Sequence, residues 1–178
     1  MKFVVSFIAT TGMLFLSLQA ISQDSCSQAK VFIGDVPFIC AQRDEFAEGV
    51  KSAHLNFKKT LGYKQIYETR SMFALPATVV SLFNYDSELV MLQFIFPVNN
   101  TTNAYKNIRK QMDQAYGAHT RIVGYELSPK FEYRWALNDG VKITFKRRRG
   151  SERARLTYSL PKKAKAFLYQ QGFQQAGW

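Results

Sequence analysis

Residues 131–160 read FEYRWALNDGVKITFKRRRGSERARLTYSL, and this stretch decides the fold. Apolar and polar residues alternate over most of it, which is the pattern of strands that bury one face and expose the other. Turn-forming residues interrupt the alternation twice, at 138–140 and at 149–152. The stretch therefore predicts a three-stranded antiparallel meander with one apolar face.

The loop at 138–140 sets the register of the first two strands. A two-residue turn would place Leu137 opposite Lys142, an apolar residue against a charged one, and would repeat that mismatch along the ladder. A three-residue loop with a left-handed Gly140 places Leu137 opposite Val141 and gathers the apolar residues on one face. We therefore expect the three-residue loop. The predicted pairs are Trp135–Ile143, Tyr133–Phe145, Phe145–Leu156 and Ile143–Tyr158.

Two apolar stripes at helical spacing predict the main helices outside this stretch. They consist of Phe46, Val50, Ala53, Phe57 and Leu61, and of Tyr105, Ile108, Met112 and Ala115. We expect the first helix to end near Gly62, which would cap it, and the second to stop at Gly117. A weaker third helix is predicted from Lys162 to Gln171, after Pro161.

The remaining periodic segments predict strands. Residues 78–84 and 88–96 flank a turn-like tripeptide, and residues 63–75 and 121–127 are two further candidates. The segment ELVMLQFIF at 88–96 is apolar at nearly every position, which indicates an interior strand covered on both faces. The fold class that follows is α+β, an antiparallel sheet packed with two main helices.

The elements follow the order helix, strands, helix, strands. This order suggests a duplicated helix-plus-strands unit that starts near residue 43 and again near residue 103. The arrangement is similar to small exported inhibitor domains of the β-lactamase-inhibitor-protein type. The resemblance is one of architecture, and it implies an inhibitor-like or other protein-interaction role.

The N-terminus has the pattern of a targeting segment. Residues 1–22 hold one charge, Lys2, followed by an apolar run and by small residues on both sides of Ile21, which is the layout of a cleaved secretory signal peptide. A membrane anchor is the alternative, but the apolar run is short of the roughly 20 residues of a span, and no basic cluster follows it. We therefore expect a single domain over 23–178, periplasmic or secreted, without a transmembrane anchor.

The expected export bears on the chemical state of the two cysteines. In an oxidising compartment Cys26 and Cys40 are most simply a disulfide, which would pin the mature N-terminus. A reactive thiol or a metal ligand is the alternative. Their spacing argues against it, because it is not C-x-x-C and no acidic or histidine cluster surrounds either residue.

Positive charge is concentrated in one part of the chain. The whole chain has 24 basic and 13 acidic residues, a net charge of +11, and residues 128–165 hold twelve of the basic residues against three acidic ones. The predicted register opposes Lys146 to Arg155 and Arg148 to Arg153, like-charge pairs that each cost a fraction of a kcal/mol. The side chains that point away from the apolar face are Glu132, Arg134, Lys142, Lys146, Arg148, Arg153 and Arg155.

Two interpretations of this basic face stay open. Most basic runs are solvated faces, and Lys and Arg discourage edge-to-edge aggregation of sheets. On the other hand, a bound anion would relieve the repulsion of the opposed like charges. The candidate partner-binding residues are Arg134, Lys142, Lys146, Arg148, Arg153 and Arg155. Lipid head groups, lipopolysaccharide, acidic glycans or an acidic protein surface are the candidate partners, and nucleic acid is disfavoured by export and by the lack of interleaved aromatic residues.

The sequence holds no catalytic or metal motif that we recognise. G-x-S-x-G, H-E-x-x-H, glycine-rich phosphate loops and C-x-x-C are absent. His54 is interpreted as a surface or boundary residue of the first helix, and His119 lies in a loop without a partner that the sequence names. We therefore expect no catalytic residue, no metal and no cofactor, and we favour a protein that is not an enzyme.

The leading hypothesis is a non-enzymatic exported protein that binds an acidic partner through the basic sheet face. The alternative is a protein-interaction role, such as an inhibitor, immunity or assembly factor in the cell envelope. An enzyme with an unrecognised site comes third, because nothing in the sequence names its chemistry.

Overall fold

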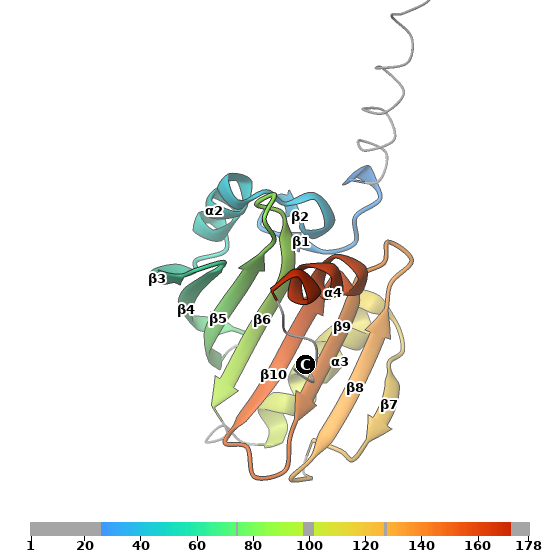
Figure 1. The fold of residues 1–178 in the computed structure, drawn as a ribbon. Helices are drawn as coiled ribbons and strands as arrows, with labels where there is room; N and C mark the ends of the chain where they lie inside the picture. The colour runs from blue at the N-terminus through green and yellow to red at the C-terminus, as the bar shows by residue number, and fades with distance from the viewer. Residues whose placement is uncertain (1–25, 74, 98–101, 127, 172–178) are drawn as a thin grey trace, which may run out of the picture.

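The computed structural model describes residues 26–73, 75–97, 102–126 and 128–171. The predicted signal peptide, residues 1–22, lies outside these ranges. Within them, no helix combines the length and the apolar character that a membrane span requires. The fold class is α+β, as predicted, with one large antiparallel sheet and three α-helices among the described residues (Figure 1).

Eight strands form the main sheet. They are β3 Asn56–Leu61, β4 Lys64–Met72, β5 Leu75–Phe83, β6 Leu89–Pro97, β7 Thr120–Val123, β8 Phe131–Ala136, β9 Lys142–Arg147 and β10 Arg153–Ser159. Their order in the sheet is β3-β4-β5-β6-β10-β9-β8-β7, and every neighbouring pair is antiparallel. The sheet therefore consists of two four-stranded meanders that join where β6 pairs with β10 (Figure 1).

The helices pack on both faces of this sheet. They are α2 Arg43–Ser52, α3 Thr102–Tyr116 and α4 Pro161–Gln170. α2 and α3 share one continuous core with the inner face of the sheet, and Figure 1 shows α3 behind the strands. α4 lies in front, at one end of the opposite face, where Phe167 clusters with Leu82, Val90 and Met91. We call the sheet face on the α4 side the open face.

The meander of β8, β9 and β10 has the predicted register. Tyr133 pairs with Phe145, which pairs in turn with Leu156, and Ile143 lies between Trp135 and Tyr158. All six of these side chains are buried, each contributing about 1.5–3 kcal/mol relative to an exposed position. The three-residue loop is also confirmed.

Gly140 is the residue that makes this loop possible. Its φ is +83°, the left-handed conformation that glycine adopts without strain. Across the loop, the backbone N–H of Leu137 donates to the carbonyl of Val141 at 2.9 Å. The apolar and basic residues are therefore sorted to opposite faces of the sheet, as the sequence predicts.

The strand predicted at 88–96 is confirmed as an interior strand. β6 lies between β5 and β10, and its residues Phe94 and Phe96 are buried in the main core. Its other face is covered at one end by α4, which packs on Val90 and Met91. Apolar residues on both faces explain why this strand lacks the alternation seen in β8–β10.

The first predicted helix is too long. α2 ends at Ser52, and residues 56–61 form β3 instead, with Phe57 and Leu61 exposed at 57% and 54%. The apolar stripe is therefore helical only as far as Val50, and Ala53 is the C-cap of α2. Helical and strand spacing both fit such a short apolar run. Antiparallel pairing with β4 decides the outcome, because it supplies hydrogen-bond partners for the backbone of residues 56–61.

A turn between α2 and β3 redirects the chain. His54 has a left-handed φ of +55° and follows the helix instead of lying on it, which corrects its expected position. The backbone N–H of Leu55 then bonds to the carbonyl of Val50 at 3.1 Å. Gly62, expected as a helix cap, has a φ of +57° in the turn that joins β3 to β4.

The other two predicted helices are confirmed. α3 ends at Tyr116, and the N–H of the following Gly117 donates to the carbonyl of Asp113 at 2.9 Å. Gly117 has a φ of +85°, as expected of a glycine that stops a helix. α4 begins at Pro161 and ends at Gln170, within one residue of its predicted bounds.

The strand predicted at 121–127 is shorter than expected, because β7 ends at Val123. Gly124 follows with a φ of +63°, and a Cβ there would lie 2.1 Å from the carbonyl oxygen of Lys130. The chain therefore turns sharply at a close backbone approach that only glycine permits. The rest of the predicted strand lies beyond this turn, with residue 127 outside the described residues.

Each half of the sheet is a helix followed by four strands, since α2 precedes β3–β6 and α3 precedes β7–β10. Duplication of one unit is not shown by this arrangement and stays a prediction.

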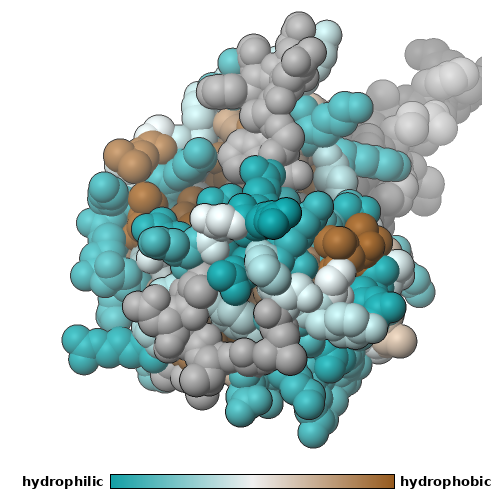
Figure 2. Space-filling model, turned by 90° about the horizontal axis from the view of Figure 1, so that it is seen from below, coloured by the Kyte–Doolittle hydropathy of each residue, from teal (hydrophilic) through white to brown (hydrophobic). Residues whose placement is uncertain are grey.

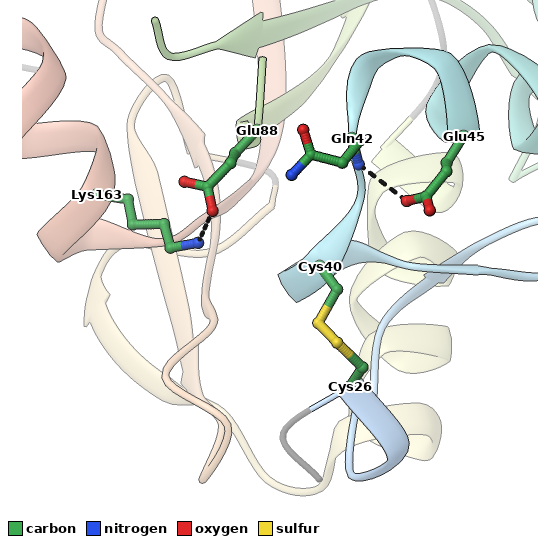
Figure 3. The surroundings of a disulfide bond; sticks show 6 residues. All are labelled: Cys26, Cys40, Gln42, Glu45, Glu88 and Lys163. Carbon is green, nitrogen blue, oxygen red and sulfur yellow. Dashed lines mark hydrogen bonds and ion pairs between the residues drawn. A yellow bond between two sulfur atoms is a disulfide. The ribbon is translucent and has the colours of Figure 1, made fainter. Parts of the chain in front are cut away.

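The predicted disulfide fastens the N-terminal segment. Cys26 and Cys40 are bonded, with their Cα atoms 5.8 Å apart. Between them lie a small hairpin, β1 Phe32–Ile33 with β2 Val36–Pro37, and the 3₁₀ turn η1 Phe38–Cys40. Figure 3 shows the bond directly before α2, where the carboxylate of Glu45 accepts the backbone N–H of Gln42 at 3.1 Å.

Removal of the disulfide should lower stability by about 3 kcal/mol, the value expected for a loop of about 15 residues. The variant is Cys26→Ser with Cys40→Ser, and urea unfolding followed by tryptophan fluorescence measures the difference. Wild-type protein treated with a reducing agent should match the variant. A loss well below about 1 kcal/mol would show that the loop is equally ordered without the bond.

Stability should fall as pH rises from about 10 to 12. Burial raises the pKa of Tyr67 and of Tyr133 to about 12, and burial places the pKa of Tyr158 well above its ordinary value. The folded protein therefore favours the neutral phenols, so this stabilisation is full below the unfolded pKa of about 10 and is lost above it. Urea unfolding at several pH values measures the loss, and Tyr67→Phe should reduce it.

Candidate functional site

The open face over β8, β9 and β10 carries the basic residues singled out in the sequence. Along each strand they alternate with buried core residues, so the register that buries the aromatic side chains turns the basic ones to the opposite side. α4 covers one end of the open face and packs against β6 (Figure 1). The candidate site is therefore a flat sheet surface bordered by a helix.

The structure brings four of the six predicted binding residues together on adjacent strands. Arg134 lies on β8, Lys142 and Lys146 on β9, and Arg155 on β10. All four are half-buried. Lys146 stands directly opposite Arg155, as predicted, and opposite Glu132 on its other side.

The predicted opposition of Arg148 to Arg153 is not part of the sheet. The ladder between β9 and β10 ends at Arg147 and Ala154. Arg148 belongs to the turn, and its carbonyl accepts the backbone N–H of Ser151 at 3.0 Å. Arg153 begins β10 and pairs with Pro97 of β6. Both arginines are exposed at the end of the molecule where β9 turns into β10.

Figure 2 shows the end of the molecule that carries this turn. Its surface is mostly hydrophilic, with small hydrophobic areas toward two sides. Arg148 and Arg149 are exposed in the β9–β10 turn, outside the strand pairing that positions Lys146 and Arg155.

Among the described residues, a carboxylate on the open face pairs with one of these cations, Arg134. The Nε of Arg134 donates to Oε1 of Glu132 at 2.6 Å, and Nη2 of Arg134 lies 2.5 Å from the same oxygen in an ion pair. Among the described residues, none forms an ion pair with Lys142, Lys146 or Arg155. Positive charge therefore remains uncompensated where β9 and β10 meet.

Lys146 lies at the centre of this charge. Burial lowers its pKa below the ordinary value of lysine. The nearby charges of Arg148, Arg155 and Arg134 lower this pKa further, against the opposite effect of Glu132. The protonated ammonium is therefore held at a position that costs free energy, and a bound anion would offset that cost.

Neutral polar residues form the next row of the open face. Thr144 and Thr157 pair across β9 and β10, one step along the strands from Lys146 and Arg155. Gln93 of β6 donates from Nε2 to the hydroxyl oxygen of Thr157 at 3.0 Å. Hydroxyl groups therefore lie beside Lys146 and Arg155. The acidic side chain opposite Lys146 is Glu132, which forms an ion pair with Arg134.

A polar cluster that the sequence does not predict lies at the end of α3. Asp113 accepts hydrogen bonds from Arg109 at 2.8 Å and from the indole N–H of Trp135 at 3.2 Å, and its Oδ1 lies 2.7 Å from Nδ1 of His119. Arg109 also pairs with Glu126, whose pKa is lowered by hydrogen bonds and by the charge of Arg109 despite burial. His119 thus has a partner after all.

This cluster connects separate elements of the fold. It joins α3 to β8 and to the loop after β7, and its charged groups are 10–25% exposed. Within the described chain, no serine, threonine or cysteine side chain hydrogen-bonds to His119. The helical spacing of Arg109 and Asp113 is visible in the sequence, but their partners across the fold are not.

The described parts of the chain contain no group of three or more His, Cys, Asp or Glu side chains arranged to hold a metal ion. Comparison of the sequence with family models and with curated proteins, and of the structure with solved structures, gives no match. The function must therefore be argued from the open face itself.

Replacement of Lys146 by glutamine should leave stability unchanged or raise it by a few tenths of a kcal/mol. The substitution removes a half-buried charge that stands opposite Arg155, and such like-charge pairs are destabilising. Urea unfolding of Lys146→Gln measures the change, with Lys110→Gln on the exposed side of α3 as the control. A loss above about 1 kcal/mol would mean that the ammonium makes a stabilising contact in the folded protein.

Proposed function

We propose that this chain is an exported, non-enzymatic protein that binds an acidic partner through the open face of β8, β9 and β10. A disulfide between Cys26 and Cys40 supports export, because such bonds persist in oxidising compartments. The periplasm or the extracellular space is the proposed location. The partner is a component of the cell envelope or an acidic protein surface.

One observation carries the proposal. Lys146 and Arg155 are held side by side by the strand register, and no described carboxylate forms an ion pair with either of them. A surface selected only for solubility would gain nothing from two opposed cations that repel each other. Repulsion in the free protein becomes attraction once an anion lies between the two side chains.

A second candidate function is a protein-interaction role, such as an inhibitor, immunity or assembly factor. The observation that favours it is the edge strand β3, all of whose residues are exposed, including the large apolar side chains of Phe57 and Leu61. Exposed apolar residues on a sheet edge suit contact with another protein. A bulge after Phe57 and the Lys58–Glu68 ion pair limit how closely a further strand can pair there.

Binding to immobilised heparin, a sulfated glycan, tests the main proposal. The double variant Lys146→Gln with Arg155→Gln should weaken binding at least tenfold, because it removes the two uncompensated cations. Affinity of the wild type should fall steeply as sodium chloride rises, since the contacts are charge-led.

The matched control removes the same charge from the other side of the sheet. Lys106→Gln with Lys110→Gln, both exposed on α3, should change heparin binding less than twofold. Equal weakening by the two double variants would show that only net charge matters, and the open face would then be an ordinary solvated surface. A stoichiometric protein partner that resists high salt would favour the second candidate instead.

A further inference from the structure

We propose that Lys146 and Arg155, together with the hydroxyl groups of Thr144 and Thr157, form a binding site for one phosphate group. The phosphate is carried either by a lipid head group or by a soluble phosphorylated molecule. This inference rests on the proposed function, because it names the ligand chemistry of the same open face.

The strand register supplies the geometry. Lys146 pairs with Arg155 and Thr144 pairs with Thr157, and both pairs point to the open face. Directly opposed side chains are about 5 Å apart at Cβ, and the two pairs are about 7 Å apart along the strands. The four residues therefore outline a small rectangle, with both cations on one side and both hydroxyls on the other.

Neither cation of this rectangle forms an ion pair with a described carboxylate. Glu132, the carboxylate opposite Lys146 in the register, is held by a hydrogen bond and an ion pair with Arg134. On the other side of Arg155, β6 contributes the neutral Ile95. Burial and the neighbouring cations lower the pKa of Lys146, and an anion bound here would raise it again.

Both hydroxyl groups retain a proton to donate. The Thr157 oxygen accepts the amide of Gln93 at 3.0 Å, which leaves its own O–H free to turn toward a ligand. The Thr144 side chain forms no hydrogen bond with another described residue, although it is half-buried. An oxyanion above the rectangle can therefore accept hydrogen bonds from an ammonium, a guanidinium and two hydroxyls.

A phosphate group fits these donors better than a carboxylate does. A phosphate monoester carries about −1.5 to −2 charges at pH 7 and three acceptor oxygens, so it can compensate both cations at once. A carboxylate carries a single charge, and it would leave Lys146 or Arg155 without compensation. The diester phosphates of nucleic acid carry one charge each, and the described residues of the open face around this rectangle include no exposed aromatic ring for base stacking.

Titration with inorganic phosphate tests the site in the mature protein. We expect saturable binding by calorimetry, and in NMR spectra a rise in the pKa of the Lys146 side chain when phosphate is bound. Lys146→Gln and Arg155→Gln should each weaken binding at least tenfold. Thr144→Val should weaken it about threefold while leaving heparin binding unchanged, because it removes a hydrogen bond and no charge.

Two further ligands distinguish the source of the phosphate. Vesicles of phosphatidylcholine that contain phosphatidic acid test a lipid source, and glycerol 3-phosphate tests a soluble one. Preference for phosphatidic acid over phosphatidylglycerol at equal surface charge, or saturable binding of glycerol 3-phosphate, supports the site. The first result indicates a lipid source of the phosphate, and the second indicates a soluble one.

The outcomes separate this site from the broader proposal. If phosphate does not saturate below about 20 mM while heparin binding still depends on Lys146 and Arg155, the phosphate site is wrong and the acidic-partner function stands. If heparin binding is also insensitive to these two residues, both are wrong. Equal binding of acetate and phosphate would likewise overturn the phosphate site.

Discussion

A slip of β8 by one residue against β9 would turn Phe131, Tyr133 and Trp135 away from the core and would turn Glu132 and Arg134 toward it. The register is therefore the constraint on which the rest of the structure depends. Tyr105 of α3 packs against Phe131 and Phe145, which share the inner face only in this register. The docking of α3 and the placement of the basic residues are thus consequences of the same pairing.

Stability and binding make different demands on this sheet. Aromatic packing stabilises the inner face, where Phe131, Phe145 and Tyr105 are in mutual contact. The outer face keeps Lys146 opposite Arg155, an arrangement that packing does not require. Proteins tolerate locally unfavourable pairs where function gives them a use, and the large inner core supplies the stability that such a pair removes.

The sequence predicts most of this fold wherever periodicity is long and unambiguous. The alternation in residues 131–160 fixes the register of three strands, and the stripe that begins at Tyr105 predicts α3. The helix predicted from the sequence fails after Ser52, because the spacing of Phe57 and Leu61 fits both a helix and a strand. Pairing with β4 decides between the two. Local periodicity does not predict which strands pair over long sequence separations.

The same limit applies to the candidate site. That Lys146 opposes Arg155 follows from the register, but the neutralisation of Glu132 by Arg134 depends on side-chain conformations within one strand. The contact of His119 with Asp113 needs α3 to pack across β8, which no spacing in the sequence predicts. Strand positions could thus be assigned in advance, whereas side-chain partners could not.

The seam between β6 and β10 has a consequence for the order of folding. Nearly every strand pairs with its neighbour in the chain, whereas Gln93 and Thr157 meet across this seam at a separation of 64 residues. During synthesis the first meander emerges before its long-range partner exists, which leaves one edge of β6, its most apolar strand, unpaired. An open apolar edge is a template for association with other chains. The nascent protein is therefore most prone to aggregation in the interval before β10 arrives.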